Sequence, residues 1–223
     1  PSRGLVKDGN YTWLVLALLL LLIAVPVADG FDAISRSFTR AFAFSCLLGI
    51  GVLSLKGSGR AYAVAMGIAL VGIILNIAAA QTGNAAFDYG AFFFILAFLV
   101  ISIVVTFRNV ATFADISANR IVGAVAVYLS LGVLWAVAYT IVELTWPGSF
   151  AGFDSLEDID WDSEWLYFSF VTMTTLGYGD ISPLSPIARL LAYMQAIFGQ
   201  LYIAILIAGL VSAYISGKDR PGG

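Results

Sequence analysis

Residues 172–180 read Thr-Met-Thr-Thr-Leu-Gly-Tyr-Gly-Asp and lie between two long apolar stretches. Gly177 and Gly179 can adopt left-handed dihedrals without a Cβ penalty, so alternating handedness can turn successive carbonyls to one side. Rings of such carbonyls from several symmetry-related copies can replace the water around a monovalent cation. Thr175 can add its hydroxyl, whereas the bulky side chains that flank Gly177 must point away from the axis. An ordinary glycine turn is the alternative interpretation, but the full nonapeptide is far more specific than Gly-x-Gly. It predicts cation coordination by backbone oxygens.

The composition places this segment in a membrane. The 223 residues are 61% hydrophobic and 11% charged, and their mean hydropathy of +0.95 is too high for one soluble core. Crossing about 30 Å of hydrocarbon takes roughly 20 apolar residues in a helix. Stretches of this kind lie near 11–28, 41–55, 61–80, 90–107, 121–145 and 186–215. The sequence therefore predicts an all-α integral membrane protein with six transmembrane helices.

Two of these stretches are less certain to form transmembrane helices on sequence grounds: one is short, and the other has an alternative interpretation. The stretch 41–55 is short and becomes a credible span only if Ser37 to Arg40 belong to the same helix. The first stretch also resembles a secretory signal, because Val25-Pro26-Val27-Ala28 has the small residues of a cleavage site. Retention of this stretch as a first transmembrane helix is the favoured interpretation.

Charged residues predict the orientation in the membrane. Eight of the eleven basic residues fall on one side of a six-span arrangement, namely Arg3, Lys7, Lys56, Arg60, Arg108, Arg120, Lys218 and Arg220. By the positive-inside rule this side and both termini are cytoplasmic, with Arg36, Arg40 and Arg189 as exceptions at the outer side. The external loop before the nonapeptide collects acidic residues, namely Asp154, Glu157, Asp158, Asp160, Asp162 and Glu164. They either concentrate cations at the outer mouth or form a solvated turret.

The residues needed for catalysis are scarce. The chain has no histidine and a single cysteine, Cys46, and its membrane stretches contain no paired catalytic carboxylates. An enzyme, a cofactor or a nucleic-acid partner is therefore not expected. Cys46 is read as a small buried hydrophobic residue.

The segments around the nonapeptide carry a family resemblance. Before it runs the aromatic stretch 164–170, Glu-Trp-Leu-Tyr-Phe-Ser-Phe, and after it comes the last apolar stretch. Over roughly residues 160–215, about a quarter of the chain, the sequence resembles tetrameric cation channels of the potassium-channel superfamily, bacterial type. The resemblance implies a re-entrant pore helix from Ser163 to Thr174, followed by a selectivity filter. It also implies a fourfold-symmetric homotetramer in the plasma membrane, in which each chain assembles with three identical subunits.

The resemblance also assigns roles to filter residues. It implies that the backbone carbonyls of four residues bind potassium ions, together with the Thr175 hydroxyl; these are Thr175, Leu176, Gly177 and Tyr178. Residues expected to support the filter are Tyr167, Phe168, Thr174, Gly179 and Asp180. In the family, aromatic residues such as Trp165, Tyr167 and Phe168 form a cuff against the filter tyrosine, although core filling is the alternative.

Two departures from the family pattern concern Asp180. Many relatives carry a tryptophan pair where this chain has Tyr167-Phe168, so Tyr167 is the candidate to hydrogen-bond Asp180 in place of a tryptophan. Val171 occupies a position that is a buried glutamate in some bacterial relatives. A carboxyl–carboxylate pair behind the filter is therefore not expected.

The final helix is expected to contain gating and cavity residues. Pro183 and Pro186 delay its start, and Gly199 lies where the family places a hinge glycine. Close helix packing is an equally good reading of Gly199, because small residues are favoured at helix contacts in lipid. At helical spacing Gln200, Ile203 and Ile207 would face a water-filled cavity. A hydrogen bond from Gln200 to the pore helix is the competing explanation.

The first four helices lack a standard voltage sensor. No Lys or Arg occurs between Ala61 and Phe107, whereas a sensor moves several positive charges through the field. Asn76 and Asp88 are expected to have loop or packing roles. The predicted organisation is an N-terminal four-helix region (1–110), a pore domain (111–217) and a short cytoplasmic tail (218–223).

The function expected from the sequence is passive, potassium-selective conduction with potassium as the permeant ligand. A poorly selective monovalent cation channel, a potassium-transporter subunit and a membrane scaffold with a vestigial pore are the alternatives.

Overall fold

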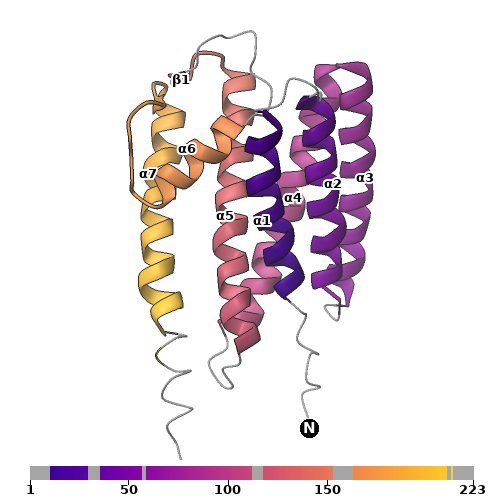
Figure 1. The fold of residues 1–223 in the computed structure, drawn as a ribbon, viewed down its shortest axis with the longest axis vertical. Coiled ribbons are helices and arrows are strands. Elements are labelled where there is room, and N and C mark those ends of the chain that lie inside the picture. The colour runs from indigo at the N-terminus through magenta and orange to yellow at the C-terminus, as the bar shows by residue number, and fades with distance from the viewer. Residues whose placement is uncertain are drawn as a thin grey trace, which may run out of the picture.

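The structure is a computed structural model that describes residues 11–29, 36–56, 59–111, 118–152, 163–209 and 212. Helices dominate the described residues, as the sequence predicts (Figure 1). In chain order the elements are α1 (Tyr11–Asp29), α2 (Arg36–Ser54), α3 (Arg60–Thr82), α4 (Ala85–Val110), α5 (Ala118–Thr145), β1 (Phe150–Ala151), α6 (Ser163–Met173), β2 (Ser182–Pro183), α7 (Pro186–Leu201) and the π-helix η2 (Tyr202–Ile207).

The long helices lie side by side, and the short helix α6 crosses obliquely at one end of the bundle (Figure 1). α6 packs against α5 and α7 and also touches α1. One continuous hydrophobic core includes Leu18 of α1, Phe44 of α2, Ile95 of α4, Val133 of α5 and Trp165 of α6. The first four helices are therefore packed onto the elements that carry α6.

Four helices among the described residues are long and apolar enough to cross a membrane: α3, α4, α5 and α7 extended to Ile205. α1 and α2 contain shorter apolar helices, Tyr11–Val27 and Phe38–Ser54. α2 begins at Arg36 and so includes Ser37 to Arg40, which was the condition for its counting as a span. The described part of the chain thus has six apolar helices where six were expected, whereas six membrane crossings stay a prediction.

Local sequence signals explain several helix boundaries. Gly83, with φ 60°, ends α3 in the left-handed conformation that glycine accommodates. The next residue, Asn84, caps α4 by accepting a hydrogen bond from the Ala86 amide at 2.9 Å. At the start of α7, Ser185 accepts from the Ala188 amide at 3.3 Å, and Pro186 occupies the first turn, where it needs no hydrogen-bonding N–H.

Polar contacts link α2 to its neighbours α4 and α3. The Arg40 guanidinium of α2 forms a partly buried ion pair with Asp88 of α4 at 2.8 Å and lies 5.7 Å from the centre of the Phe92 ring. Asn76 of α3 is buried and donates to the Ala41 carbonyl of α2 at 3.1 Å. The packing roles expected for Asn76 and Asp88 are confirmed.

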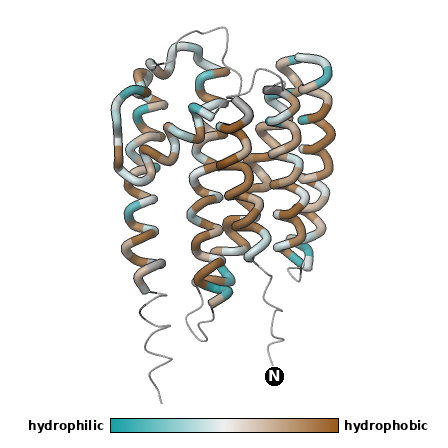
Figure 2. Tube along the Cα trace, viewed as in Figure 1, coloured by the Kyte–Doolittle hydropathy of each residue, from teal (hydrophilic) through white to brown (hydrophobic). Residues whose placement is uncertain are grey.

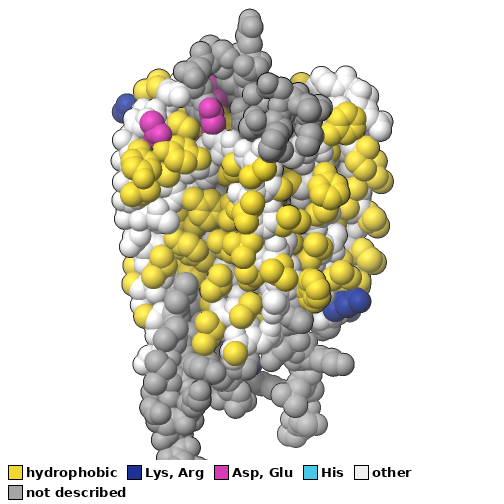
Figure 3. Space-filling model, in the orientation of Figure 1, with side chains coloured by type: hydrophobic (Ala, Val, Ile, Leu, Met, Phe, Trp, Pro, Cys, Tyr) yellow, Lys and Arg dark blue, Asp and Glu magenta, His cyan; other side chains and the backbone are white. Residues whose placement is uncertain are grey.

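The surface of the bundle is apolar along its length. Hydrophobic residues follow the long helices in Figure 2. Figure 3 shows a face covered by hydrophobic side chains, with the visible Lys, Arg, Asp and Glu side chains near its two ends. Exposed hydrophobic residues include Phe42 at 67% and Ile74 at 65%. Such a surface is compatible with lipid rather than water.

Several residues used for the orientation fall outside the described residues, namely Arg3, Lys7, Asp154, Glu157, Asp158, Asp160, Asp162, Lys218 and Arg220. The tail 218–223 falls there too. The expected boundary after residue 110 coincides with the end of α4 at Val110. The division into domains stays a prediction.

Candidate ion-binding site

The short helix α6 is held by an aromatic cluster. Its 11 residues make it about 16 Å long at 1.5 Å per residue, too short to cross a membrane. Trp165 and Phe168 are buried on one side, where the ring of Phe150 lies 5.1 Å from Trp165 and 5.5 Å from Phe168. Tyr139 of α5 completes the cluster, 4.9 Å from Phe168. These rings fix α6 against α5 and β1.

The end of α6 is bonded directly to the segment that follows it, residues 174–180, here called the filter segment. The Thr174 amide donates to the Phe170 carbonyl at 3.0 Å, and the Leu176 and Gly177 amides donate to the Val171 carbonyl at 3.0 and 3.3 Å. The Thr174 hydroxyl donates to Phe170 at 2.7 Å. The last carbonyls of the helix, which lack partners inside it, therefore set the start of the filter segment.

Every second residue of the filter segment has a positive φ. The values are 60° at Thr175, 58° at Gly177 and 82° at Gly179. The left-handed φ predicted for the two glycines is confirmed. Thr175 is the one non-glycine residue with positive φ in the part of the chain that the structure describes. A β-branched residue is strained in this region, so the surrounding hydrogen bonds must hold Thr175 there.

Asp180, at the end of the filter segment, is bonded from two sides. The Tyr167 hydroxyl donates to its Oδ2 at 2.5 Å, and the Ile181 amide donates to its Oδ1 at 2.9 Å. The hydrogen bond expected between Tyr167 and Asp180 is thus confirmed. These two bonds, that from Tyr167 first, lower the pKa of the Asp180 carboxyl. The same bond to Asp180 is the main cause that raises the pKa of Tyr167 to about 12.

Tyr167 is also the aromatic partner of the filter tyrosine. Its ring stacks on that of Tyr178 with centres 6.4 Å apart and an angle of 7° between the planes. Trp165 and Phe168 make their described ring contacts in the cluster with Tyr139 and Phe150 instead. Within one chain, the Tyr167 ring thus lies against the filter tyrosine as a cuff would require, whereas Trp165 and Phe168 lie in the core; a cuff that supports the filter stays a prediction. Support of the filter by Phe168 stays a prediction.

A two-stranded clip closes the loop that carries α6 and the filter segment. β1 and β2 are antiparallel, with Phe150 opposite Pro183 and Ala151 opposite Ser182. Gly152 has a φ of 104°, and a Cβ there would lie 2.0 Å from the Asp180 carbonyl oxygen. Only glycine permits this approach. The clip therefore brings the start of the loop against the end of the filter segment.

Glu143 of α5 anchors the clip. Its buried carboxylate accepts from the Gly148 amide at 2.5 Å and from the Phe150 amide at 3.1 Å. Glu143 is not among the residues predicted from the sequence. A single acidic residue near the end of an apolar helix is the signal that could have identified it, because a buried carboxylate requires donors.

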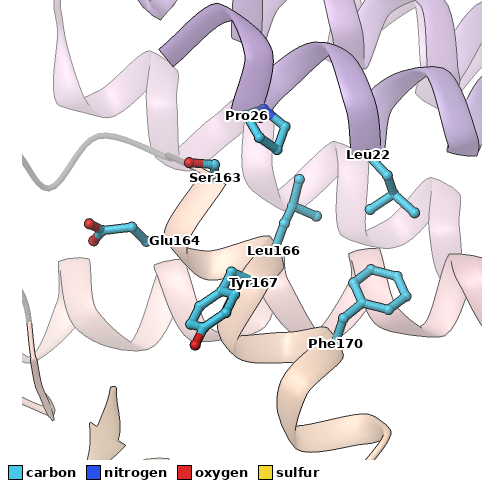
Figure 4. A pocket seen from close by; sticks show the side chains of 7 residues that line it. All are labelled: Leu22, Pro26, Ser163, Glu164, Leu166, Tyr167 and Phe170. Atoms are coloured by element: carbon cyan, nitrogen blue, oxygen red, sulfur yellow. The ribbon is translucent and has the colours of Figure 1, made fainter. Parts of the chain in front are cut away.

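Figure 4 shows where α1 meets α6. Leu22 and Pro26 of α1 face Leu166, Tyr167 and Phe170 of α6 around a cavity of about 550 Å³. Ser163 and Glu164 lie at the edge of the cavity where α6 begins. Through α1 the first four helices thus reach the helix that carries Tyr167.

α7 packs against the end of α6 through Gly199. A Cβ on Gly199 would lie 2.7 Å from both the carbonyl oxygen and the Cγ of Met173. Close packing therefore accounts for this glycine, and a hinge there stays a prediction. Below it the helix changes to the π-helix η2, in which the Tyr202 hydroxyl donates to the Ala124 carbonyl of α5 at 2.8 Å.

The polar contact between α7 and α6 comes from a residue that the sequence analysis did not select. Gln195 is fully buried and donates to the Ser169 hydroxyl at 2.7 Å and carbonyl at 3.0 Å. Gln200 instead has an exposed side chain, as does Ile203 at 39%. The side chain of Ile207 lies outside the described residues. The bond to α6 suggested for Gln200 is thus made by Gln195, which presents the same sequence signal.

The described residues contain no group of three or more His, Cys, Asp or Glu side chains that could hold a metal ion. Side-chain chemistry at the filter segment is limited to hydroxyl groups and Asp180. Backbone oxygens are therefore the most numerous ligands that it can offer to a cation.

Comparisons with known proteins find similarity to channels, and the family match lies on the part of the chain that carries this site. The ion channel family matches residues 126–216. Two-pore potassium channel c of Oryza sativa subsp. japonica is 35% identical over 93 residues, 42% of this chain and 18% of that protein. Two-pore potassium channel 5 of Arabidopsis thaliana is 47% identical over 47 residues, 21% of this chain and 12% of that protein.

A bacterial protein also matches. The inward rectifier potassium channel Kirbac3.1 of Paramagnetospirillum magnetotacticum is 33% identical over 82 residues, 35% of this chain and 24% of that protein. The chain spans 12% to 24% of the length of these three relatives. No solved structure gives a significant match. The matches are to channels rather than to enzymes, and over the matched residues they support a likeness to the potassium-channel superfamily.

Proposed function

We propose that this chain, whose second half is similar to potassium channels, forms a potassium-selective pore that conducts passively down the electrochemical gradient. The ions are bound by the backbone carbonyls of the filter segment and by the Thr175 hydroxyl. The carbonyls are those of Thr175, Leu176, Gly177 and Tyr178.

The observation that carries this proposal is the backbone of the filter segment. Positive φ at Thr175, Gly177 and Gly179 alternates with the intervening residues, which is the pattern needed to direct successive carbonyls to one side. The segment starts at the carboxyl end of α6, where the helix dipole favours a cation. Both features serve the binding of a dehydrated monovalent cation.

A homotetramer with three further identical subunits follows from the need for complete rings of ligands, because one chain supplies one filter segment. The exposed surface supports an assembly. Tyr178 is 68% exposed and Leu176 is 57% exposed. Phe198 and Ile205, after the filter, are 54% and 67% exposed. Neighbouring subunits around a central axis would cover these large apolar side chains.

The proposed topology has six membrane crossings in the plasma membrane and both termini in the cytoplasm. α1 begins, and α2, α4 and α7 end, at the end of the bundle opposite β1 (Figure 1). α1 contributes 19 residues, about 28 Å of helix at 1.5 Å per residue, close to the thickness of the hydrocarbon. A standard voltage sensor is not part of this proposal.

The deciding experiment is the reversal potential of single channels, or of many channels in vesicles, in opposing potassium and sodium gradients. Potassium selectivity supports the proposal. Equal reversal potentials in the two ions, with current present, would identify a poorly selective cation channel. Purified chain that carries no current points to a scaffold, and flux coupled to a second ion points to a transporter subunit.

Gly177→Ala tests the role of the filter segment. A Cβ on Gly177 would meet no neighbouring atom in the chain, so the effect comes from the left-handed backbone, which costs an L-residue about 1–2 kcal/mol per subunit. Selective conduction is expected to be lost. Gly67→Ala on α3 is the matched control, because a Cβ there also meets no atom and alanine favours a helix.

A further inference from the structure

A buried network of hydrogen bonds joins α5, α6 and α7, and α6 directly precedes the filter segment. The Tyr139 hydroxyl of α5 donates to Gln195 Oε1 of α7 at 2.5 Å. Gln195 Nε2 donates to the Ser169 hydroxyl and carbonyl of α6 at 2.7 and 3.0 Å. The Ser169 hydroxyl in turn donates to the Gly132 carbonyl of α5 at 2.6 Å. The side chains of Tyr139, Ser169 and Gln195 are all fully buried.

Each side-chain polar hydrogen in this hydrogen-bond network has a defined acceptor. The Ser169 carbonyl can only accept, so the amide nitrogen of Gln195 must face α6 and its oxygen must face the Tyr139 hydroxyl. Both amide hydrogens and both hydroxyl hydrogens are then used. A fully satisfied buried network of this kind specifies one arrangement of its helices.

A second contact lies one helical turn further along the same two helices. Ser169 and Met173 are one turn apart on α6, and Gln195 and Gly199 are one turn apart on α7. Met173 O lies 2.7 Å from the position of a Cβ on Gly199. The hydrogen bonds of Gln195 and the close contact of Gly199 therefore lie one turn apart on both helices, and together they fix the position of α6 along the axis of α7.

The carbonyls of the same turn of α6 hold the filter segment. Ser169 directly precedes Phe170 and Val171, whose carbonyls accept the amides of Thr174, Leu176 and Gly177. A shift of α6 relative to α7 would therefore move the hydrogen-bond acceptors that position the filter backbone.

We infer that Gln195 is a positioning residue for ion selectivity. Through Ser169 it holds α6, and hence the filter segment, at a fixed position along the axis of α7. This inference rests on the proposed function as a potassium channel. Gln195 itself does not contact the permeant ion. Its contribution differs from general packing, because it acts on the geometry of the carbonyl rings.

The test compares the permeability ratio of potassium to sodium in wild type, Gln195→Met and Tyr139→Phe, each reconstituted as the full chain in vesicles. Methionine is close to glutamine in length but cannot donate to Ser169. Because a buried hydrogen bond to a neutral group is lost, the ratio is expected to fall about tenfold in Gln195→Met. Tyr139→Phe keeps the ring contacts with Phe150 and Phe168 and is expected to lower the ratio less.

Asn76→Leu is the matched control, because Asn76 is also a buried amide with one described partner, the Ala41 carbonyl, but lies in α3. Its permeability ratio is expected to equal that of wild type, even where its thermal unfolding midpoint falls. If both Gln195→Met and Tyr139→Phe keep the wild-type permeability ratio, the inference is overturned but the proposed function is not. This holds even if the thermal unfolding midpoints of the two variants fall. If Gln195→Met does not assemble, Tyr139→Phe decides. A wild-type ratio near one would overturn the proposed function and the inference with it.

Discussion

Asp180 shows how single side chains stabilise the end of the filter segment. Its pKa is lowered by the hydrogen bonds from Tyr167 and Ile181, so these bonds contribute stability above the usual carboxyl pKa. This stability is lost as the pH falls through the lowered pKa of Asp180. On the alkaline side the contact is lost as the pH rises through the pKa of Tyr167, about 12. The contact is therefore intact at neutral pH.

Replacing Tyr167 by phenylalanine tests this contact. The substitution removes the hydroxyl that donates to Asp180 and keeps the ring that stacks on Tyr178. The pKa of Asp180 is expected to return towards its ordinary value, so potassium current should be lost at a higher pH on acidification than in wild type. The measurement is an acid titration of the current in vesicles. Tyr62→Phe in α3 serves as the control, and superimposable titrations of all three proteins would contradict the prediction.

At this scale the sequence predicts what a residue type requires, but not which partner satisfies it. Gly177 and Gly179 are predictable because positive φ favours glycine. The positive φ of Thr175 is not, because it is imposed on a β-branched residue by the hydrogen bonds to the end of α6. Gln195 and Gln200 carry the same signal, an amide in an apolar helix, and only the packing of α7 shows that Gln195 is the buried one.

The contact between α6 and α7 decides between the two readings of Gly199. If close packing is its role, Gly199→Ala places a Cβ 2.7 Å from the Met173 carbonyl oxygen, and such overpacking costs about 1–3 kcal/mol. If a hinge is its role, alanine should instead stabilise the helix by roughly 1 kcal/mol and reduce opening. We expect a lower thermal unfolding midpoint, together with a lower potassium-to-sodium permeability ratio.

Gly49→Ala in α2 is the control for Gly199→Ala, because a Cβ there meets no neighbouring atom. A Gly199→Ala protein that unfolds at a higher temperature than wild type and opens less often would contradict the packing role.

The helices themselves follow from apolar stretches and local caps, as Gly83, Asn84 and Ser185 illustrate. Their lengths are less predictable. α2 and α4 begin several residues before the apolar stretches expected from hydropathy, because Arg40 and Asp88 pair with each other inside the bundle. The change from α7 to the π-helix after Leu201 also depends on tertiary packing, and no residue in the segment signals it.

Across the whole molecule, opening is expected to depend little on voltage. No basic residue occurs from Ala61 to Phe107, and the buried Arg40 is held in an ion pair with Asp88. Because a steep sensor moves about three or four charges per subunit, these helices should contribute almost no gating charge. Any voltage dependence should then change with the permeant ion. A steep conductance–voltage curve that survives ion substitution, with gating currents in a non-conducting variant, would refute this prediction.

The Arg40–Asp88 pair is expected to determine how the first four helices hold together. Arg40→Met removes the guanidinium that pairs with Asp88, and because the pair is only partly buried, the cost should lie below the ~3–5 kcal/mol of a fully buried pair. The double variant Arg40→Met/Asp88→Leu removes both charges and should recover most of the loss. Denaturant unfolding in detergent measures both. A single variant as stable as wild type would show that the pair contributes little.

The β1–β2 clip makes the segment that carries α6 and the filter segment a separable unit of the chain. Because Ala151 pairs with Ser182, the segment between Gly152 and Ile181 begins and ends at the same place in the molecule. Such a cassette can be exchanged between related proteins without changing the paths of α5 and α7, provided that the side chains by which α6 contacts them are kept. Filter chemistry can therefore diversify during evolution on an unchanged helical scaffold.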